Sequence, residues 1–319
     1  RYTLGHATVA VIVGGRPYEI TPFRGWTNTL KEDLAHRDLT INAMALDPET
    51  RQIIDLHNGR RDLRDKVIRA VENPDNRFRE DPLRLLRSVR FAAQLDFKIH
   101  KDTSSAISEN ASLLSNAAPE RIREELMKIL MVQKPSGYFN TLATTGLLKT
   151  FIPELLEGRL KRQNRYHRYT IFKHILKTVD YVKPDPLLRV TALFHDIAKP
   201  RIRAKKEGTW RFHGHEKESA LLAEEIMKRL KFSNEMIRKA THLIKNHLIG
   251  YNSGWSNAAV RRLIKRVGPD FIEDLVTFRK ADILAHGKMN SNQELLLQLD
   301  ARIQDQLASS PPIHVSDLA

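Results

Sequence analysis

The sequence has no cysteine among its 319 residues, so it forms no disulfide bond, and this composition fits a reducing cytoplasm. It also has no run of 18 apolar residues, so we expect no transmembrane helix. The first fifteen residues, RYTLGHATVAVIVGG, form a short β-rich run without the layout of a signal peptide. Together these absences favour a cytoplasmic globular protein without a membrane partner.

Positive charge, in contrast, is abundant. The chain has 53 Lys and Arg against 38 Asp and Glu, a net charge of +15 and a pI near 10.0. Such an excess points to a polyanion partner, and RNA, DNA and anionic lipid all qualify. The basic residues gather in four clusters, Arg77–Arg90, Arg159–Arg168, Lys199–Lys206 and Arg261–Arg266. Clusters spread along a chain indicate an extended contact with a nucleic-acid backbone, although each alone is more often a solvated face.

Only the beginning of the chain is β-rich. Two runs, Ala7–Val13 and Pro17–Thr21, flank Gly14-Gly15-Arg16 and are predicted to form a hairpin. Glu19 lies in the second run, where a side chain usually faces solvent, and a catalytic role stays open. Helical periodicity follows, and Pro119–Leu130 is one of the predicted helices. With 41% apolar residues, the chain is long enough for two or three domains. The predicted fold class is α+β, a small β-containing piece followed by a long helical array.

The segment Arg77–Ala93, RFREDPLRLLRSVRFAA, has the most informative polar pattern. Asp81 is a good N-cap and Pro82 fits the first helical position, so we expect a helix to begin here. Arg84 and Arg87 lie off its apolar side. That apolar side is formed by Leu85, Leu86, Val89, Ala92 and Ala93.

The polar residues around this helix start match the edge of a nucleobase. Glu80, Asp81 and Arg84 put two carboxylates and one forked donor within a single turn. A carboxylate accepts from an exocyclic amine such as that of cytosine, and a guanidinium donates to ring acceptors. The alternative is a capped, salt-bridged helix with an arginine-rich solvated side. These seventeen residues taken alone favour that alternative.

Imidazole and carboxylate side chains recur in the second half of the chain in the order His, His-Asp, His, His, Asp. Such a set can bind one or two divalent transition metals. A bound metal would polarise a phosphoryl oxygen and generate hydroxide, which is the chemistry of a phosphohydrolase. Any single histidine is more often a core or surface residue, and only the whole set, with each member expected on a helix and in this order, is specific. The expected ligands are His174, His195, Asp196, His215, His247 and Asp282.

Three motifs, in the right order, resemble those of class II tRNA nucleotidyltransferases and bacterial poly(A) polymerases. EDLAHRDLTINAMALD is similar to their RRDxTxNA motif, and REDPLRLLRSVRFAA to the EDxxR motif that reads the nucleotide. PERIREELMKIL resembles the motif of the neck, and the histidine series resembles the HD domain that bacterial members often carry. The resemblance covers essentially the whole chain. It implies a partial nucleotidyltransferase β-sheet head at 1–70, a helical neck at 71–150, a helical HD domain at 151–290 and a helical tail at 291–319.

The resemblance also implies a role for each matching residue. Asp81 and Arg84 would read the incoming base by hydrogen bonds, as a protein template in place of a nucleic-acid one. Arg37, Asp38 and Asn42 would hold the ribose and phosphates of the incoming nucleotide. The side chains that would contact its phosphates or the neck are Arg87 and Arg90.

The catalytic head of the family opens with a Gly-rich turn and an Asp-x-Asp pair that holds two Mg²⁺ ions. We find no such pair in Arg1–Lys31, so the sequence resembles a piece that begins inside the head, and its last residues, PPIHVSDLA, resemble one that ends before a further element. Glu19 falls where the family places a third acidic residue beside the metals. Attack of an RNA 3′-OH on an α-phosphate needs the metal clamp. We therefore predict that this polypeptide as given incorporates no labelled CTP.

The connection Gly25–Lys31 is short. Relatives that add the terminal A carry a longer loop here, and relatives that add only CC have it shortened. The resemblance therefore predicts CC addition, with tRNA and CTP as substrates and ATP use left open. Two alternatives from other classes remain, a metal-dependent phosphohydrolase acting through the HD residues and an RNA-binding module without turnover. The oligomeric state and the identity of the HD metal do not follow from the sequence.

Overall fold

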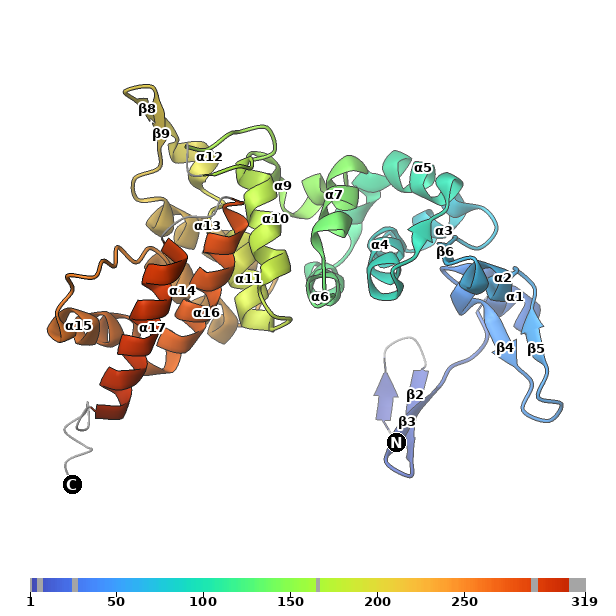
Figure 1. Ribbon diagram of the computed structural model, residues 1–319. Coiled ribbons are helices and arrows are strands. Elements are labelled where there is room, and N and C mark those ends of the chain that lie inside the picture. Colours follow the sequence, from blue (N-terminus) through green and yellow to red (C-terminus); the bar gives the residue numbers. More distant parts are fainter. Residues whose placement is uncertain (1, 5–7, 25–27, 165–166, 288–291, 310–319) are drawn as a thin grey trace. The chain divides into compact units, whose positions relative to one another are not determined.

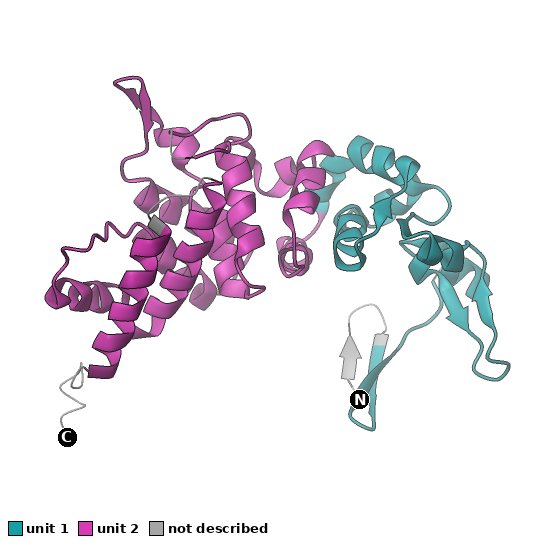
Figure 2. Cartoon of the chain, viewed as in Figure 1, with its two compact units in different colours: residues 1–116 teal, residues 117–319 magenta. Residues whose placement is uncertain are grey.

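The computed structural model describes residues 2–4, 8–24, 28–164, 167–287 and 292–309 (Figure 1). The chain forms two compact units, 1–116 and 117–319 (Figure 2). The α+β class is confirmed, since most strands belong to unit 1 and unit 2 is mainly helical. The predicted subdivision at residues 70, 150 and 290 is finer than these two units and stays a prediction. No helix among the described residues is long and apolar enough to cross a bilayer.

The first strands of unit 1 form an antiparallel sheet. They are β1 (Tyr2–Leu4), β2 (Thr8–Val13) and β3 (Arg16–Ile20). The hairpin between β2 and β3 is confirmed, but its turn contains only Gly14 and Gly15, at φ 55° and 77°. Positive φ at both positions is typical of a tight hairpin turn and suits glycine. Placing Arg16 in the turn was wrong, because Arg16 already pairs with Val13.

Short helices and two small sheets make up the rest of unit 1. They are α1 (Leu30–Ala35), η1 (Thr40–Asn42), β4 (Met44–Leu46), β5 (Ile53–Asp55), α2 (Gly59–Arg64), β6 (Val67–Ile68), α3 (Pro74–Glu80), α4 (Leu83–Leu95), β7 (Lys98–Ile99), α5 (Lys101–Glu109) and η2 (Ala111–Asn116). β4 pairs with β5 antiparallel and β6 with β7 parallel. The connection from β6 to β7 contains α3 and α4, so the predicted base-reading segment is held between two paired strands.

Helix α4 begins later than predicted. Pro82 is its N-cap rather than its first helical residue, and Asp81 is the extended C-cap of α3, a helix that was not predicted. The residue before a proline is pushed out of the helical region, so α3 ends here. The Asp81 side chain still accepts a hydrogen bond from the backbone N–H of Leu83 at 3.1 Å. The apolar side is confirmed, because all five of its residues are buried: Leu85, Leu86, Val89, Ala92 and Ala93.

Unit 2 is a helical array with one small hairpin. Its elements are α6 (Pro119–Leu130), α7 (Ser136–Thr144), α8 (Leu147–Phe151), α9 (Pro153–Leu156), α10 (Ile171–Tyr181), α11 (Pro186–Phe194), α12 (Lys199–Ile202), β8 (Ala204–Lys206), β9 (Thr209–Arg211), α13 (His215–Arg229), α14 (Asn234–Asn246), α15 (Asn257–Val267), α16 (Pro269–Ala285) and α17 (Asn292–Ser309). α10 packs against α11 and α16, α11 against α14, and α13 against α14 (Figure 1).

Capping side chains set where three helices of this bundle begin. Thr170, Asp185 and Ser233 each accept a hydrogen bond from a backbone N–H in the first turn of α10, α11 and α14. An N-cap of this kind satisfies a donor that the helix itself leaves unpaired. Because each of these helices has a defined first residue, the position of each histidine along or at the end of its helix is also defined.

Candidate functional site

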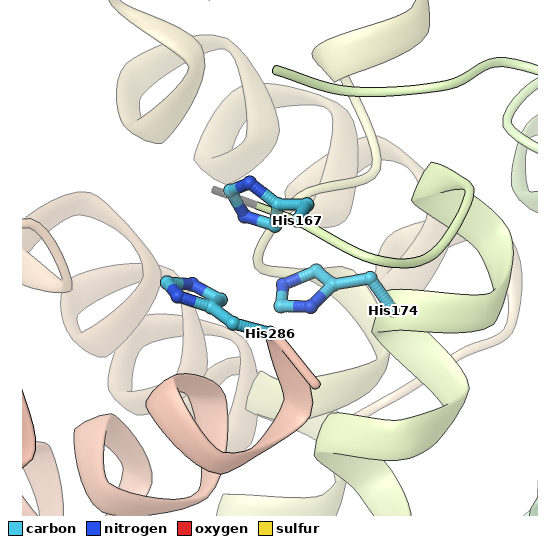
Figure 3. Close-up of side chains that lie close together, drawn as sticks. All are labelled: His167, His174 and His286. Carbon is cyan, nitrogen blue, oxygen red and sulfur yellow. The ribbon is translucent and has the colours of Figure 1, made fainter. Parts of the chain in front are cut away.

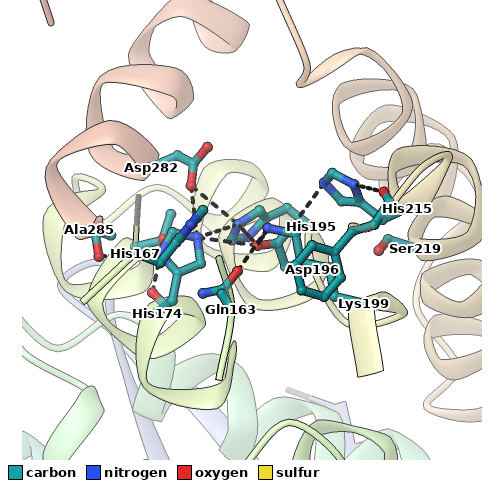
Figure 4. Close-up of polar contacts among 12 residues, drawn as sticks. Gln163, His167, His174, His195, Asp196, Lys199, His215, Ser219, Asp282 and Ala285 are labelled. Atoms are coloured by element: carbon teal, nitrogen blue, oxygen red, sulfur yellow. Dashed lines mark hydrogen bonds and ion pairs between the residues drawn. The ribbon is translucent and has the colours of Figure 1, made fainter. Parts of the chain in front are cut away.

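Six side chains predicted as metal ligands meet in one buried group of unit 2, which we call the HD cluster. Figure 4 labels all of them except His247. Its members are His174 in α10, His195 and Asp196 after α11, His215 at the start of α13, His247 after α14 and Asp282 in α16. The expectation that every histidine lies on a helix was wrong for His195 and His247, which are C-caps. At the end of a helix the backbone leaves the helical path, so the side chains of consecutive residues can point toward the same place.

One half of the HD cluster is formed by two histidines and two carboxylates. Nε2 of His174 lies 3.2 Å from Oδ2 of Asp196 and 3.0 Å from Oδ1 of Asp282. Nε2 of His195 lies 3.2 Å from Oδ2 of Asp196 and 3.4 Å from Oδ1 of Asp282. Each carboxylate therefore faces both rings. This is the arrangement that one cation between the four side chains would need.

The other half of the HD cluster shares Asp196. Nε2 of His215 lies 3.2 Å from Oδ1 of Asp196, and Nε2 of His247 lies 3.9 Å from the same oxygen. The candidate ligand atoms of Asp196, His215 and His247 lie within 4.8 Å of one another, as do those of His174, His195 and Asp196. Asp196 could thus bridge two cation positions through its two oxygens.

Backbone carbonyls set the tautomers of three of these rings. In each case Nδ1 faces the carbonyl oxygen of the residue three positions earlier, and a carbonyl only accepts, so Nδ1 carries the hydrogen. Nε2 of each ring therefore faces the cluster, and in the neutral ring it presents its lone pair there, which is the usual arrangement of a metal-bound histidine. The pairs are His195 with Ala192 at 2.9 Å, His215 with Phe212 at 2.8 Å and His247 with Ile244 at 2.7 Å.

Charge is concentrated in this buried site. Burial acts to raise the pKa of Asp196, but His195 and Lys199 hold that pKa well below its ordinary value. Burial acts to lower the pKa of His195, but Asp196 and Asp282 raise it to about 9. Burial also acts to raise the pKa of Asp282, but the neighbouring Arg279 holds that pKa well below its ordinary value. Two buried carboxylates need positive charge around them, which protein side chains or a bound cation can supply.

Lys199 was missed by the sequence reasoning. Its buried Nζ lies 2.5 Å from Oδ2 of Asp196 and donates to Oε1 of Gln163 at 3.1 Å. The available signal was its spacing, because Lys199 follows Asp196 by three residues, less than one helical turn. Oδ1 of Asp196, Oδ1 of Asp282 and Nε2 of His215 are buried and have no hydrogen-bond partner among the described residues. The donor set and these orphaned atoms fit a divalent transition metal.

Two more histidines lie beside the HD cluster (Figure 3). His167 precedes α10, and His286 is the C-cap of α16. The candidate ligand atoms of His167, His174 and His286 lie within 4.8 Å of one another. Burial lowers the pKa of His167 to about 2 and that of His286 to about 4, so both rings are neutral. Sequence reasoning missed both residues, although His286 follows Asp282 by one helical turn.

In unit 1 the structure joins Asp38 to α4, the helix predicted to read the base. Oδ2 of Asp38 lies 2.5 Å from Nη2 of Arg87 and accepts from its Nε at 2.7 Å. Oδ1 of Asp38 accepts from the Asn42 amide at 3.1 Å and from the backbone N–H of Leu39 at 2.9 Å. Burial acts to raise the pKa of Asp38, but Arg87 and these hydrogen bonds hold it below its ordinary value. Asp38 and Asn42, predicted together for the ribose and phosphates, are therefore in contact, and Arg87, predicted for the phosphates or the neck, lies against Asp38.

Arg84 is anchored at the start of α4. Its Nη1 donates to Oε2 of Glu80 at 2.7 Å and to the carbonyl of Arg77 at 3.3 Å, and its Nη2 donates to the carbonyl of His36 at 2.8 Å. Its side chain is 11% exposed. A guanidinium has five N–H donors, so two remain beyond these three bonds. The salt bridge expected for the alternative, a capped and salt-bridged helix, is therefore present. It orients the guanidinium but does not occupy all of its N–H donors.

The other predicted residues of unit 1 are placed less closely together. Arg37 donates to Asp33 through Nη2 at 2.6 Å and Nε at 3.0 Å. Arg90 is buried and its guanidinium lies 3.5 Å from the centroid of the Phe91 ring. Glu19 lies exposed on β3, and its side chain has no ion pair or hydrogen bond among the described residues. The structure therefore does not bring Glu19 into contact with Asp38.

Family profiles match three parts of the chain. Residues 5–69 match the poly A polymerase head domain, and residues 96–158 match a segment described as the probable RNA and SrmB-binding site of polymerase A. Residues 167–292 match the HD domain. These profiles follow one another in the order expected from the three motifs.

Curated relatives carry names from one enzyme group. The A-adding tRNA nucleotidyltransferase of Deinococcus radiodurans is 32% identical over 97% of this chain and 78% of its own. The CCA-adding enzyme of Ligilactobacillus salivarius is 44% identical, but the match covers 45% of this chain and 39% of that enzyme. The chain thus spans most of the first relative and about two fifths of the second.

Solved structures show the same fold. A CCA-adding enzyme of Bacillus stearothermophilus in complex with CTP is 24% identical, with a TM-score of 0.65 over 98% of this chain and 71% of that one. A CCA-adding enzyme of Thermotoga maritima complexed with tRNA is 22% identical, with a TM-score of 0.60 over 98% of this chain and 70% of that one. Because the match to the Deinococcus relative covers 97% of this chain and 78% of that enzyme, the chain belongs to the tRNA nucleotidyltransferase and poly(A) polymerase family and carries an HD domain.

Proposed function

We propose that this protein takes part in adding nucleotides to the 3′ end of tRNA. Family membership supports this proposal, and one geometric observation carries it. The ion pair between Asp38 and Arg87 holds the RRD-type segment against α4, the helix that begins beside Arg84. A segment suited to ribose and phosphate and a segment suited to a base edge are thereby coupled in one unit.

Selection of the base falls to the start of α4. Arg84 keeps two N–H donors beyond its internal bonds, and Asp81 places a carboxylate next to the same helix start. A forked donor beside an acceptor suits the Watson–Crick edge of cytosine or adenine. Glu80 contributes by orienting Arg84 rather than by touching the base. Asn42 and Arg87 position Asp38 for the sugar and phosphates.

The transfer step also needs metal ions. Mg²⁺ would polarise the α-phosphate and activate the RNA 3′-OH. All groups of three or more potential metal ligands among the described residues lie in unit 2. Glu19 is exposed and stands apart from Asp38, so the described residues of unit 1 do not fit a Mg²⁺ pair. The part of unit 1 that we describe binds and selects the nucleotide.

For specificity we propose addition of C residues, on the basis of the short connection Gly25–Lys31. Residues 25–27 of this connection lie outside the described residues, and its last two residues belong to α1, which begins at Leu30 with Thr29 as its N-cap. The experiment supplies an Asp-x-Asp strand upstream of Arg1 and offers CTP and ATP with tRNAs that lack CCA or only the final A. We expect C incorporation on the first tRNA and none on the second. Addition of A to the second tRNA would contradict CC specificity.

The transfer proposal itself has a stricter test. Asp38→Asn in the same extended protein should lower incorporation at saturating tRNA, because the segment that holds the sugar loses its link to Arg87. Asp65→Asn, at an exposed helix end, serves as the matched control. Equal incorporation by both variants and the parent would contradict the assigned role. Tight tRNA binding without any turnover would favour the RNA-binding alternative.

One observation favours a second activity, hydrolysis of a phosphate ester at the HD cluster. Three imidazoles present Nε2 to two buried carboxylates, and their Nδ1 atoms are fixed by carbonyls. A divalent transition metal held there would supply a polarised water, while Lys199 would place a positive charge beside Asp196. The 319-residue chain should hydrolyse a 2′,3′-cyclic nucleotide, and Asp196→Ala should abolish this. Hydrolysis that survives Asp196→Ala would rule out this site.

A further inference from the structure

The three histidines at the edge of the HD cluster come from separate parts of the chain. His167 lies in the loop before α10, His174 in α10, and His286 directly after α16 (Figure 3). The ring centroids are 4.2 Å apart for His167 and His286, 5.1 Å for His167 and His174, and 5.5 Å for His174 and His286. We call these three residues the histidine triad. His167 and His286 are outside the six HD residues predicted from the sequence.

We propose that the histidine triad is a transition-metal site of its own, which binds a divalent ion of the zinc, cobalt or nickel class. Imidazole nitrogen is the ligand that these ions prefer, whereas Mg²⁺ and Mn²⁺ prefer oxygen. Three protein ligands leave a coordination position open for water, as in catalytic zinc sites. The proposal does not depend on nucleotidyl transfer or on hydrolysis.

Hydrogen bonds leave one nitrogen of each ring for a metal. Nδ1 of His174 lies 3.3 Å from the carbonyl of Ala285, and Nδ1 of His167 lies 2.8 Å from Oδ1 of Asn164. An oxygen partner at Nδ1 is the usual support of a ligating histidine and leaves Nε2 as the ligand. Nδ1 of His286 is buried and has no hydrogen-bond partner among the described residues. A buried, unpartnered ring nitrogen next to two further imidazole rings suits a metal ligand.

The fold holds the loop before α10 against the end of α16. The backbone N–H of Arg168 donates to the carbonyl of His286 at 2.9 Å. Gly287 has φ 71°, and a Cβ at this position would lie only 2.6 Å from the Tyr169 ring. Glycine at 287 therefore permits both the left-handed backbone and the close approach of Tyr169. Because Arg168 and Tyr169 are fixed in this way, His167 is fixed beside His286.

An ion can reach the triad from outside. His167 lines a cavity of about 510 Å³ together with Gln163, Asn164 and Tyr169. An entry path is one requirement of a genuine metal site. Nε2 of His174 also faces Asp196 and Asp282, so an ion in the triad and an ion in the HD cluster compete for this one nitrogen. The triad is therefore a second position for metal, alternative to the HD position at His174.

The test separates the two positions by changing the HD carboxylate. The 319-residue chain with Asp196→Asn is dialysed against Zn²⁺ or Mn²⁺, and bound metal is counted per chain. We expect retained Zn²⁺ and no Mn²⁺. Adding His286→Ala should weaken Zn²⁺ binding at least about tenfold. Adding His242→Ala, whose ring instead faces the carbonyl of Val267, should leave it unchanged. Absence of Zn²⁺ from the folded Asp196→Asn chain, or no effect of His286→Ala, would overturn the proposal.

A second measurement applies if Asp196→Asn prevents folding, as judged by circular dichroism. The unmodified chain is then titrated with Co²⁺, whose visible absorption reports nitrogen ligands. His286→Ala and His167→Ala should each change the spectrum and weaken Co²⁺ binding, while His242→Ala should do neither. Identical spectra and affinities for all four chains would overturn the proposal. Neither measurement uses enzyme activity, so both still test the metal site if the proposed function is wrong.

Discussion

Arg87 holds Asp38 in an ion pair across 49 residues of sequence, with Nη2 2.5 Å from Oδ2. This contact connects the RRD-type segment to the helix that follows Arg84. The contact joins the two segments of unit 1 that we propose to bind the nucleotide. Several consequences of this contact and of the HD cluster can be measured.

Asp38 and Arg87 should be energetically coupled. Asp38→Asn and Arg87→Gln should each lower the free energy of unfolding by about 1–3 kcal/mol, because a charged hydrogen bond is lost. The double variant should lose less than the sum of both, which urea unfolding of all four chains will measure. The exposed pair Arg61 and Asp65, 3.6 Å apart, is the matched control and should couple by less than about 1 kcal/mol. Equal coupling in both pairs would contradict our description of the contact.

The same pair should make stability depend on acid. The pKa of Asp38 in the folded chain lies below the value of the unfolded chain, so its contribution is fully present above the unfolded pKa of about 3.9. It is lost as pH falls from that value through the folded pKa. The stability difference between the parent chain and Asp38→Asn should therefore be constant from pH 7 to about 5 and shrink below about 4. A difference that grows on acidification would contradict the sign of the shift.

Arg84→Ala should reduce the discrimination between nucleotides more than it weakens nucleotide binding. A lost bidentate contact to a base costs about 1–3 kcal/mol of discrimination. The measurement is the preference for CTP over UTP in the protein extended upstream with an Asp-x-Asp strand. Arg79→Ala, an exposed arginine of α3, is the control and should keep the preference. If both variants keep it, base reading lies elsewhere.

Binding of tRNA should fall steeply with salt, because a chain of net charge +15 releases counterions from the phosphates. Lys205 and Lys206 are exposed on β8 within one of the basic clusters. Replacing both by alanine should weaken binding to all tRNAs alike and reduce the slope of log K against log salt by about 2. Lys228→Ala, where the lysine is paired with Glu224, is the control. An unchanged slope would remove β8 from the interface.

Divalent transition metal should stabilise unit 2. A ligand that binds only the folded chain at 100 times its Kd adds about 2.7 kcal/mol. Zn²⁺ should therefore raise the thermal midpoint, a chelator should reverse the rise, and Asp196→Ala should show a smaller rise, which comes from Zn²⁺ in the histidine triad. His213→Ala, at an exposed histidine, should respond like the parent chain. A rise of equal size in Asp196→Ala would place the stabilising metal outside the HD cluster.

Local chemistry explains what could be predicted from the chain alone. The apolar side of α4, the hairpin at Gly14 and Gly15 and the full extent of α6 follow from periodicity, turn residues and a proline at a helix start. The six HD residues were found because the residue types and their order are specific. The predicted start of α4 was wrong, because Asp81 ends α3 and Pro82 is the N-cap of α4 in its place. Helix α3 was not predicted.

By itself the sequence determined which residues have metal-binding or base-reading chemistry, because side-chain type and spacing are local properties. Only the tertiary structure decided which of them meet. It joined Asp38 to Arg87, placed Lys199 on Asp196 and brought His167 to His286, while it left Glu19 exposed on β3. The physical reason is that these contacts join residues on different elements, and their distances are set by how helices pack and where each helix ends.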